Sequence, residues 1–378
     1  MSGIYIHIPF CKQACSYCDF YFVTKTDKQS AFVDALINEI RSKKETEYTS
    51  EPIETIYFGG GTPSLLTVSQ IERILSAIKD TFTLDLKEVT IELNPDDVTK
   101  EYLAELKSIG VNRVSMGVQT FDEDLLRFMN RTHNADEALK CLELLRDSNI
   151  NVFTIDLIYG NPGQSLEMLS KDLDTLLQFD PPHISAYSLT IEPKTRLGKQ
   201  VELGRLIPPE DDLVERHFEL VEEKLLTKGI KRYEVSNFAK SGSEALHNSN
   251  YWEHKNYLGF GPGAHSFWWS KGKEKAARWE NEANLNSYID QPSNAQLHLE
   301  YLDLHALAEE RLMLALRTRK GISIEELNDN YNYTFSEKQH SYILQKVKEQ
   351  KLAFDQSLRL TPSGLKLADA ITLDLITA

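Results

Sequence analysis

Strand and helix patterns alternate six times over about the first 190 residues, and this alternation limits the possible folds more than any other feature. Apolar runs predict strands at residues 4–8, 53–58, 89–93, 111–118, 152–159 and 184–190. Amphipathic periodicity predicts helices between them, including 28–42, 100–109 and 166–179. Such alternation predicts an α/β fold with a parallel sheet and helices outside it. Periodicity alone does not distinguish six units from eight.

The pattern changes after Glu192. A charged amphipathic helix is expected at 210–228 and a strand near 233–235, whereas residues 240–300, rich in Asn, Gly and aromatics, are predicted to form long ordered loops. Helices at 304–318, 324–328 and 337–350 and short strands at 352–354 and 358–360 predict a small winged-helix-like α+β module. The predicted domains are therefore 1–206, 207–300 and 301–378.

Composition narrows the function classes. The 378 residues include 42 Lys and Arg against 57 Asp and Glu, for a net charge of −15. Nucleic-acid partners are not expected, because proteins that bind them carry a basic surface. No apolar run is long enough to span a bilayer, and the N-terminus lacks the layout of a secretory signal. These features predict a cytoplasmic protein, with peripheral docking at the inner face of the membrane left open.

Three cysteines follow the first strand in a C-x3-C-x2-C pattern: Cys11, Cys15 and Cys18. An odd number of thiols cannot all pair as disulfides, whereas thiolates are the preferred ligands of iron–sulfur clusters. Three thiolates on a four-iron cluster leave one iron open to a small molecule. The alternatives are a zinc knuckle, which needs four ligands usually in CxxC pairs, and cysteines without metal. The fourth cysteine, Cys141, is predicted to lie in the core.

Polar and glycine residues are predicted at the carboxyl ends of several strands, where parallel sheets bind ligands. The run Gly59-Gly60-Gly61-Thr62-Pro63 lets the backbone approach a polar ligand. No Lys-Ser/Thr pair follows, so it is not a P-loop, and a simple tight turn is the alternative. Glu92 and Asp156 are positioned to bind ribose hydroxyls, and Arg131 to hold a carboxylate.

The cysteine spacing after a strand, together with the glycine turn, resembles the signature of the radical S-adenosylmethionine (radical SAM) superfamily. The resemblance implies an open, partial (β/α)6 barrel. It also implies a four-iron four-sulfur cluster whose open iron is chelated by the amino and carboxylate groups of S-adenosylmethionine.

Longer motifs narrow the resemblance. YIHIPFC at 5–11, GGGTP at 59–63, GVQTF at 117–121 and DLIYG at 156–160 resemble the oxygen-independent coproporphyrinogen III oxidase family. The matching positions in that family bind S-adenosylmethionine. They are Tyr5, Tyr17, Gly60, Gly61, Thr62, Glu92, Gln119, Arg131 and Asp156.

Two departures point away from the oxidases themselves. The oxidases carry a long segment before the cysteines, whereas Cys11 stands near the start of this chain, and they have a further Cys where this chain has Phe20. Both features resemble the HemW branch of heme chaperones. Residues 247–252, HNSNYW, are similar to the HNxxYW element that this branch is thought to use for heme. The resemblance implies that His247 is an axial iron ligand; the alternative is a loop histidine beside core aromatics.

The resemblance therefore predicts a heme chaperone on a radical SAM scaffold, which passes heme to acceptor hemoproteins. Respiratory hemoproteins at the cytoplasmic face of the membrane are the expected acceptors. The cluster and S-adenosylmethionine would then be structural or regulatory, or would support release of heme. The alternative is the oxidase reaction, in which two propionates of coproporphyrinogen III become vinyl groups, and a radical SAM enzyme with another substrate is a third option. Enzyme activity, the acceptors and a homodimeric state are left open.

Overall fold

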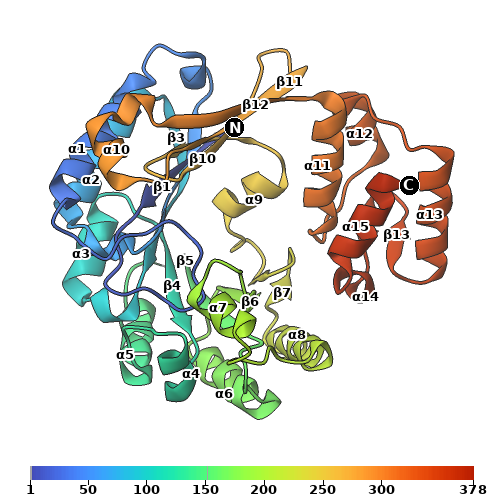
Figure 1. Cartoon of the computed structure of the whole chain (residues 1–378), viewed down its shortest axis with the longest axis horizontal. Coiled ribbons are helices and arrows are strands. Elements are labelled where there is room, and N and C mark those ends of the chain that lie inside the picture. The colour runs from blue at the N-terminus through green and yellow to red at the C-terminus, as the bar shows by residue number, and fades with distance from the viewer. Residues whose placement is uncertain (1, 151) are drawn as a thin grey trace.

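The computed structural model describes residues 2–150 and 152–378, and a mixed twelve-stranded sheet forms its centre (Figure 1). The strand order is β12-β11-β10-β9-β1-β2-β3-β4-β5-β6-β8-β7. The six parallel strands in the middle are β1 (Ser2–Ile8), β2 (Ile53–Gly60), β3 (Leu84–Leu93), β4 (Arg113–Gln119), β5 (Val152–Tyr159) and β6 (His183–Ser188). The predicted parallel sheet and its partial-barrel fold class are confirmed.

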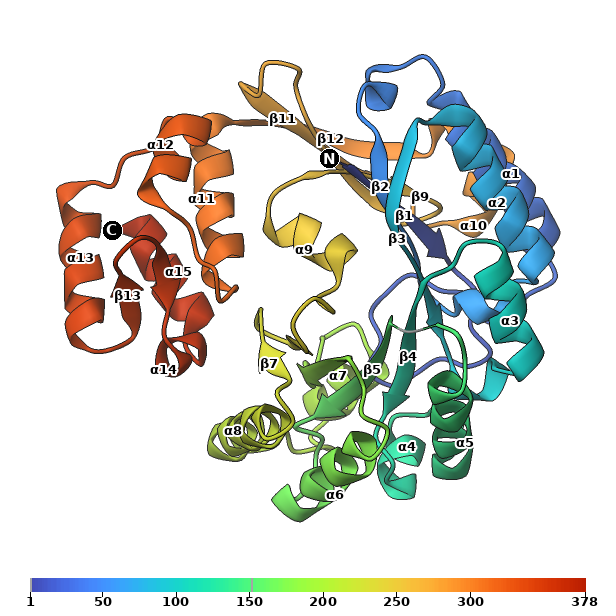
Figure 2. The same ribbon diagram turned by 180° about the vertical axis from the view of Figure 1, so that it is seen from behind.

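Helices cover the outer face of this curved sheet, as Figure 2 shows from behind. They are α1 (Gln29–Ser42), α2 (Val68–Thr81), α3 (Lys100–Ser108), α4 (Glu123–Phe128), α5 (Ala135–Arg146) and α6 (Leu166–Leu177). Short 3-10 helices lie at η1 (Glu47–Thr49), η2 (Pro63–Leu65), η3 (Pro95–Asp97) and η4 (Pro292–Asn294). A capping box of Asn134 and Glu137 begins α5 and satisfies backbone N–H groups at its first turn.

The strands of the barrel are buried on one face by apolar side chains and present polar side chains on the other. In β1, Ile4, Ile6 and Ile8 are fully buried in the main core, and Tyr5 and His7 alternate with them. Because successive side chains of a strand point to opposite faces, Tyr5 and His7 face the inside of the barrel. This inner face is the surface on which a site can be built.

The prediction of long loops at residues 240–300 is wrong. This segment forms α9 (Leu246–Trp252), β9 (Asn256–Phe260), β10 (His265–Trp269), β11 (Lys275–Asn281), α10 (Leu285–Asp290) and β12 (Gln296–Asp303). β9 pairs in parallel with β1, and β10 to β12 continue the sheet antiparallel. The glycines that suggested loops permit close packing instead: a Cβ on Gly261 (φ +99°) would lie 2.5 Å from the carbonyl oxygen of His7.

At the other edge of the barrel lie α7 (Arg196–Glu202), α8 (Asp211–Leu226), β7 (Lys231–Arg232) and β8 (Asn237–Ala239). The strand expected at 233–235 is therefore misplaced. Glu234 makes only an isolated bridge to Thr318, because the chain turns between the two short strands.

The C-terminal region stands to one side of the barrel, with α9 between them (Figure 1), and its apolar core includes Phe267, Trp269 and Ala276 of β10 and β11. Its elements are α11 (Leu304–Leu316), α12 (Ile324–Tyr331), α13 (Glu337–Lys348), β13 (Leu352–Phe354), β14 (Leu358–Leu360), α14 (Pro362–Leu365) and α15 (Ala368–Thr377). The helices and the hairpin agree with the predicted α+β module, whereas α14 and α15 were not predicted. The boundaries at residues 206 and 300 stay a prediction. Within the described ranges, no helix combines the length and apolarity needed to cross a membrane.

Candidate functional site

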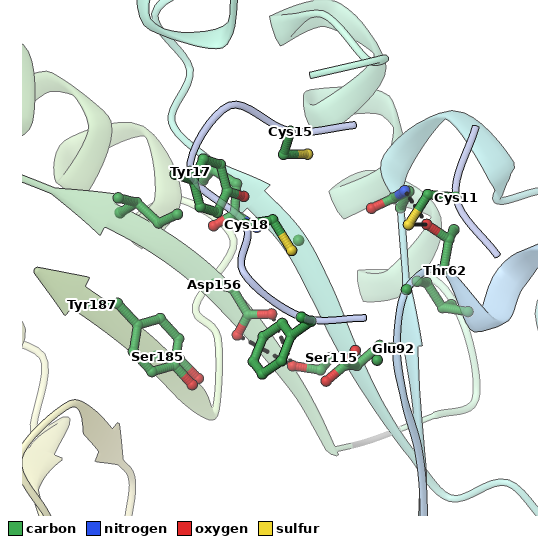
Figure 3. Close-up of a pocket in the computed structure, with 18 of the residues that line it drawn as sticks. Cys11, Cys15, Tyr17, Cys18, Thr62, Glu92, Ser115, Asp156, Ser185 and Tyr187 are labelled. Atoms are coloured by element: carbon green, nitrogen blue, oxygen red, sulfur yellow. Dashed lines mark hydrogen bonds between the residues drawn. The ribbon is translucent and has the colours of Figure 1, made fainter. Parts of the chain in front are cut away.

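A cavity of about 540 Å³ lies at the carboxyl ends of the parallel strands, and it is called the cluster cavity below. It is lined by the three cysteines of the loop after β1 and by every predicted S-adenosylmethionine residue except Tyr5. Figure 3 shows the thiols above the carboxylates of Glu92 and Asp156. Residues from β2 to β6 and from several loops thus meet where this type of sheet binds ligands.

Hydrogen bonds hold the cysteine loop at its base and in its middle. The N–H of Cys11 donates to the carbonyl of Val23 at 3.0 Å, and the N–H of Val23 donates to the carbonyl of Pro9 at 2.7 Å. Farther along, the side-chain amide of Asn130 donates to the carbonyl of Ala14 at 2.7 Å. These contacts fix the loop against the barrel.

Two donors reach the sulfur atoms. Thr62 Oγ1 donates to Cys11 Sγ at 3.6 Å, and Arg131 Nη1 donates to Cys15 Sγ at 3.5 Å. Burial raises the pKa of Cys11 to about 11 and that of Cys18 to about 12. A coordinated metal deprotonates a thiol, so a bound cation would offset this cost of burial.

The donor set fits a four-iron cluster. In the part of the chain that the structure describes, no three His, Cys, Asp or Glu side chains converge closely enough to hold a single metal ion. In a cluster each thiolate binds its own iron, so the sulfurs need not converge on one point. The three thiols line the same cavity as the hydrogen-bond donors that would stabilise their charge.

The glycine turn leaves room that side chains would fill. Gly60 has φ +107°, and a Cβ there would lie 2.6 Å from the His7 ring. A Cβ on Gly61 would lie 2.7 Å from the carbonyl oxygen of Phe10. The N–H of Gly61 already donates to the carbonyl of Ile8 at 2.8 Å. Gly61 therefore offers a ligand only its carbonyl oxygen, which suits an ammonium group.

Two half-buried carboxyl groups face the cavity from β3 and β5, the strands on either side of β4. Tyr57 Oη donates to Glu92 Oε1 at 2.7 Å, and Ser115 Oγ donates to Asp156 Oδ2 at 3.0 Å. Burial, as the main cause, raises the pKa of Glu92 to about 7 and that of Asp156 to about 6. Both carboxylates would accept hydrogen bonds from hydroxyl groups of a ligand, because such donors stabilise the charged form.

Arg131 keeps one donor free. Its Nη2 donates to Asn94 Oδ1 at 2.8 Å and to the carbonyl of Gly117 at 2.9 Å, while Nη1 reaches Cys15. Its Nε is buried and has no hydrogen-bond partner among the described residues. A buried donor without a partner is costly, so this N–H suits an anionic group of a ligand.

Tyr5 is the predicted residue that does not line the cavity. Its ring stacks on that of Tyr57 at a centroid distance of 6.1 Å, and a hydrogen bond of 3.2 Å joins its Oη to His7 Nδ1. It stands behind Tyr57, which lines the cavity and contacts Glu92. Tyr5 therefore supports the wall of the cavity from behind.

Several lining residues were not predicted. They are Arg113 and Ser115 of β4, Thr154 of β5, and His183, Ser185 and Tyr187 of β6. A signal was present, because polar residues occupy alternate positions in RVSMGVQ and HISAYS, and alternate residues share a face of a strand. These side chains enlarge the cavity beyond the predicted residues.

His247 lies outside the cluster cavity, on the face of α9 that packs against the sheet. Its exposed fraction is 1%. Hydrogen bonds join its Nδ1 to Thr55 Oγ1 at 2.8 Å and its Nε2 to Tyr251 Oη at 2.7 Å, and its ring stacks on Tyr57. Burial lowers the pKa of His247 to about 3. Both nitrogens are engaged, so in this conformation neither is available to iron.

Buried charges hold both ends of α9. Glu88 accepts hydrogen bonds from the N–H groups of Leu246 and His247, each at 2.9 Å, and lies 3.7 Å from the Arg113 guanidinium. From the C-terminal region, Arg311 donates to the carbonyl of Trp252 at 2.9 Å. The negative charge of Glu88 at the N-terminal end of α9 and the positive charge of Arg311 at its C-terminal end both interact favourably with the helix dipole.

Comparisons with known proteins define the class. The family profile described as the radical SAM superfamily matches residues 5–176, and that of the HemN C-terminal domain matches residues 302–367. The structure is similar to coproporphyrinogen III oxidase (HemN) from Escherichia coli, a radical SAM enzyme. The TM-score is 0.83 at 22% identity, with 100% of this chain and 90% of that chain covered. At this identity the similarity shows the fold, that of a radical SAM protein with a HemN-type C-terminal domain.

Curated relatives identify the family. Heme chaperone HemW from Lactococcus lactis is 35% identical over 98% of this chain and 96% of its own length. Heme chaperone HemW from Bacillus subtilis is 38% identical over 88% of this chain and 87% of its own length. The mitochondrial radical S-adenosyl methionine domain-containing protein 1 of Danio rerio is 32% identical over 98% of this chain and 86% of its own length. The chain belongs to the HemW family of radical SAM proteins, which confirms the resemblance seen in its motifs.

Proposed function

We propose that this protein is a heme chaperone, which binds heme and delivers it to acceptor hemoproteins. The observation that carries the proposal is its similarity, over nearly its whole length, to relatives that are named heme chaperones. The HNSNYW segment at 247–252 forms α9, which lies between the barrel and the C-terminal region and contacts both. Heme would bind at this helix.

The proposal includes a four-iron four-sulfur cluster on Cys11, Cys15 and Cys18, with S-adenosylmethionine beside it. When bound, these groups supply an electron donor next to a cleavable sulfonium. Their support is the donor set of the cluster cavity and the superfamily match over residues 5–176.

The residues of the cluster cavity would divide the binding of S-adenosylmethionine between them. Carbonyl oxygens of Gly60 and Gly61 would accept from its amino group, and Arg131 Nε would donate to its carboxylate. Glu92 and Asp156 would accept from the ribose hydroxyls. Thr62, Gln119 and Tyr17 line the same cavity, and Tyr5 would act through Tyr57.

His247 remains the proposed axial ligand of heme iron. Ligation through Nε2 would require the Tyr251 hydrogen bond to break and the ring to leave its stack on Tyr57. The proposal therefore includes a movement of α9 when iron is bound.

The proposed acceptors are respiratory hemoproteins, reached at the inner face of the cytoplasmic membrane. The experiment that tests the function starts with anaerobic purification and rebuilding of the cluster. Hemin is titrated against the wild type and His247→Ala, and transfer is followed to apomyoglobin as a surrogate acceptor. Light scattering in the same samples distinguishes a monomer from a homodimer.

A parallel reaction separates the chaperone from the oxidase. The protein is supplied with S-adenosylmethionine, a reductant and coproporphyrinogen III, and protoporphyrin is measured after oxidation. Heme binding and transfer without this product support the chaperone. Steady formation of protoporphyrin would show instead that the protein is an oxidase.

A further inference from the structure

A second cavity, of about 340 Å³, lies on the opposite side of α9 from the sheet. It is called the Trp252 cavity below. Its walls come from the end of β7, from α9 and from the end of α11, so barrel and C-terminal region both contribute. The lining residues used here are Glu234, Ser249, Trp252, Glu253, Arg319 and Lys320.

The helix α9 divides its residues between two faces. His247, Asn250 and Tyr251 contact the sheet, where Asn250 Nδ2 donates to Thr55 Oγ1 at 3.4 Å. Ser249, Trp252 and Glu253 line the Trp252 cavity. This spacing of three and four residues is that of helix faces. The HNSNYW segment therefore does not form one site: its histidine is packed inward and its tryptophan faces a cavity.

Trp252 differs from the other tryptophans of the chain. Trp268, Trp269 and Trp279 are at most 9% exposed and contact other aromatic rings. Trp252 is half-buried, and its indole stacks on no other described aromatic side chain. A flat apolar surface open to a cavity can stack a planar ligand.

Two adjacent cations stand at the mouth of this cavity. Arg319 is exposed, and its guanidinium makes no ion pair with another described residue, while Lys320 lies 3.4 Å from Glu253. The loop that carries them is fixed, because the N–H of Arg319 donates to the carbonyl of Tyr233 at 3.0 Å. A Cβ on Gly321 (φ +65°) would lie 2.2 Å from the carbonyl oxygen of Leu358, so the turn requires glycine at this position. In a chain of net charge −15, these cations mark a local site for anions.

A buried group without a partner lies in the same wall. Glu234 is 1% exposed, and its Oε1 has no hydrogen-bond partner among the described residues, while its Oε2 accepts from the N–H of Ser236. Burial raises the pKa of Glu234 to about 7, so its carboxyl group can carry a proton. Protonated, it would donate a hydrogen bond to an anion in the cavity.

We propose that the Trp252 cavity binds the propionate-bearing edge of a porphyrin, with the ring stacked on Trp252 and the carboxylates held by Arg319 and Lys320. The inference rests on the proposed heme chaperone function. Heme carries two propionates on one edge of a planar ring, and an arginine guanidinium matches a carboxylate in two hydrogen bonds. The volume is near the lower end for ligand pockets, so it takes one edge of the ring and leaves the rest accessible to an acceptor. Docking in this way does not require His247 to leave its packed position.

Since the contacts are to the ring and the carboxylates, iron is not needed. The test titrates the full-length protein, with its cluster rebuilt, against three probes: hemin, metal-free protoporphyrin IX and protoporphyrin IX dimethyl ester. Quenching of tryptophan fluorescence reports binding, and Trp252→Phe identifies the quenched residue. We expect the two diacids to bind with similar affinity and the dimethyl ester about tenfold or more weakly.

The double variant Arg319→Ala/Lys320→Ala should weaken both diacids about tenfold or more while cluster iron stays unchanged. Its control is Lys271→Ala/Lys273→Ala, which removes two exposed cations from the turn between β10 and β11. If the Arg319/Lys320 variant binds as the wild type does, or the ester binds as well as the diacid, this inference is wrong and the heme function stands. If the wild type binds no hemin at all, the proposed function itself fails.

Discussion

The two cavities on either side of α9 are built in opposite ways. The cluster cavity is formed by buried and half-buried groups whose hydrogen bonds are mostly made, such as Glu92 with Tyr57 and Asp156 with Ser115. The Trp252 cavity combines two exposed cations and a half-buried indole with the buried Glu234, and its lining comes from three distant segments. Buried charges keep their strength and geometry, whereas exposed ones are screened by water and salt. The first cavity therefore suits tight retention of a cofactor, and the second suits reversible binding of a ligand that must leave.

Loss of the three cysteines should separate the two cavities most clearly. Replacing Cys11, Cys15 and Cys18 together by Ser should remove all cluster iron and sulfide, because hydroxyl groups are poor ligands for these clusters. Binding of protoporphyrin IX should stay within about twofold, since the Trp252 cavity uses none of these residues. Iron analysis and fluorescence titration measure the two effects. Full iron content in the variant would contradict the cluster, and parallel loss of porphyrin binding would contradict the separation of the cavities.

Variants of Arg113 and Glu88 test whether this buried ion pair holds α9, the helix between the two cavities, in place. Arg113→Met leaves buried Glu88 without its cation, and we expect a loss of about 3–5 kcal/mol in the free energy of unfolding. Urea denaturation measures this loss. The double variant Glu88→Gln/Arg113→Met should recover part of it, because no unpaired charge remains. An Arg113→Met protein as stable as the wild type would show that the pair does not hold the helix.

His247, packed between α9 and the sheet, and Glu92 in the cluster cavity should contribute to the pH dependence of stability with opposite signs. His247 has a folded pKa of about 3 against 6.5 when exposed, so the unfolded chain binds more protons below pH 6.5 and stability is lost as pH falls. From pH 7 to pH 5 this loss is about 2 kcal/mol. Glu92 has a folded pKa of about 7 against 4.5, so its contribution makes stability fall as pH rises between these values.

Urea denaturation at pH 5 and pH 7 measures both slopes in the cluster-free protein. His247→Gln should lose less stability than the wild type on acidification, and Glu92→Gln should lose more, because each variant removes one of the opposing contributions. Identical pH dependence in the wild type and His247→Gln would show that His247 is not buried in its neutral form.

A change in salt concentration should produce the smallest difference in ligand affinity between the two cavities. Raising the salt concentration from about 0.05 M to 0.5 M should weaken porphyrin binding a few-fold, because Arg319 and Lys320 are exposed. Binding of S-adenosylmethionine, measured by equilibrium dialysis, should change less, since Arg131 Nε is buried. Equal salt dependence of the two ligands would remove this distinction.

The elements that depend on local sequence patterns were predicted, whereas those that depend on pairing with distant segments of the chain were not. The strands β1 to β6 were predicted because each shows an apolar run, and amphipathic helix patterns alternate with these runs along the chain. The segment 240–300 was not, because its strands depend on partners far along the chain: β9 is flanked by β1, more than 250 residues earlier. Local composition there indicates loops, and only tertiary pairing makes strands of it.

The site shows the same limit. Motif residues such as Gly60 and Arg131 were predicted to share a cavity, and they line it. His183 and Tyr187 were missed, because strand alternation shows a shared face without showing what the face surrounds. The two-sided packing of α9 was also beyond prediction, since Thr55 and Arg319 come together with this helix only in the folded chain.

The clamping of α9 at both ends has a mechanical consequence. One end of α9 is attached to the barrel through Glu88, and the other end is attached to the C-terminal region through Arg311. Rotation of the C-terminal region against the barrel would therefore twist the helix or break one of these attachments. Transfer of the ligand and the relative orientation of the two regions would then be parts of a single movement.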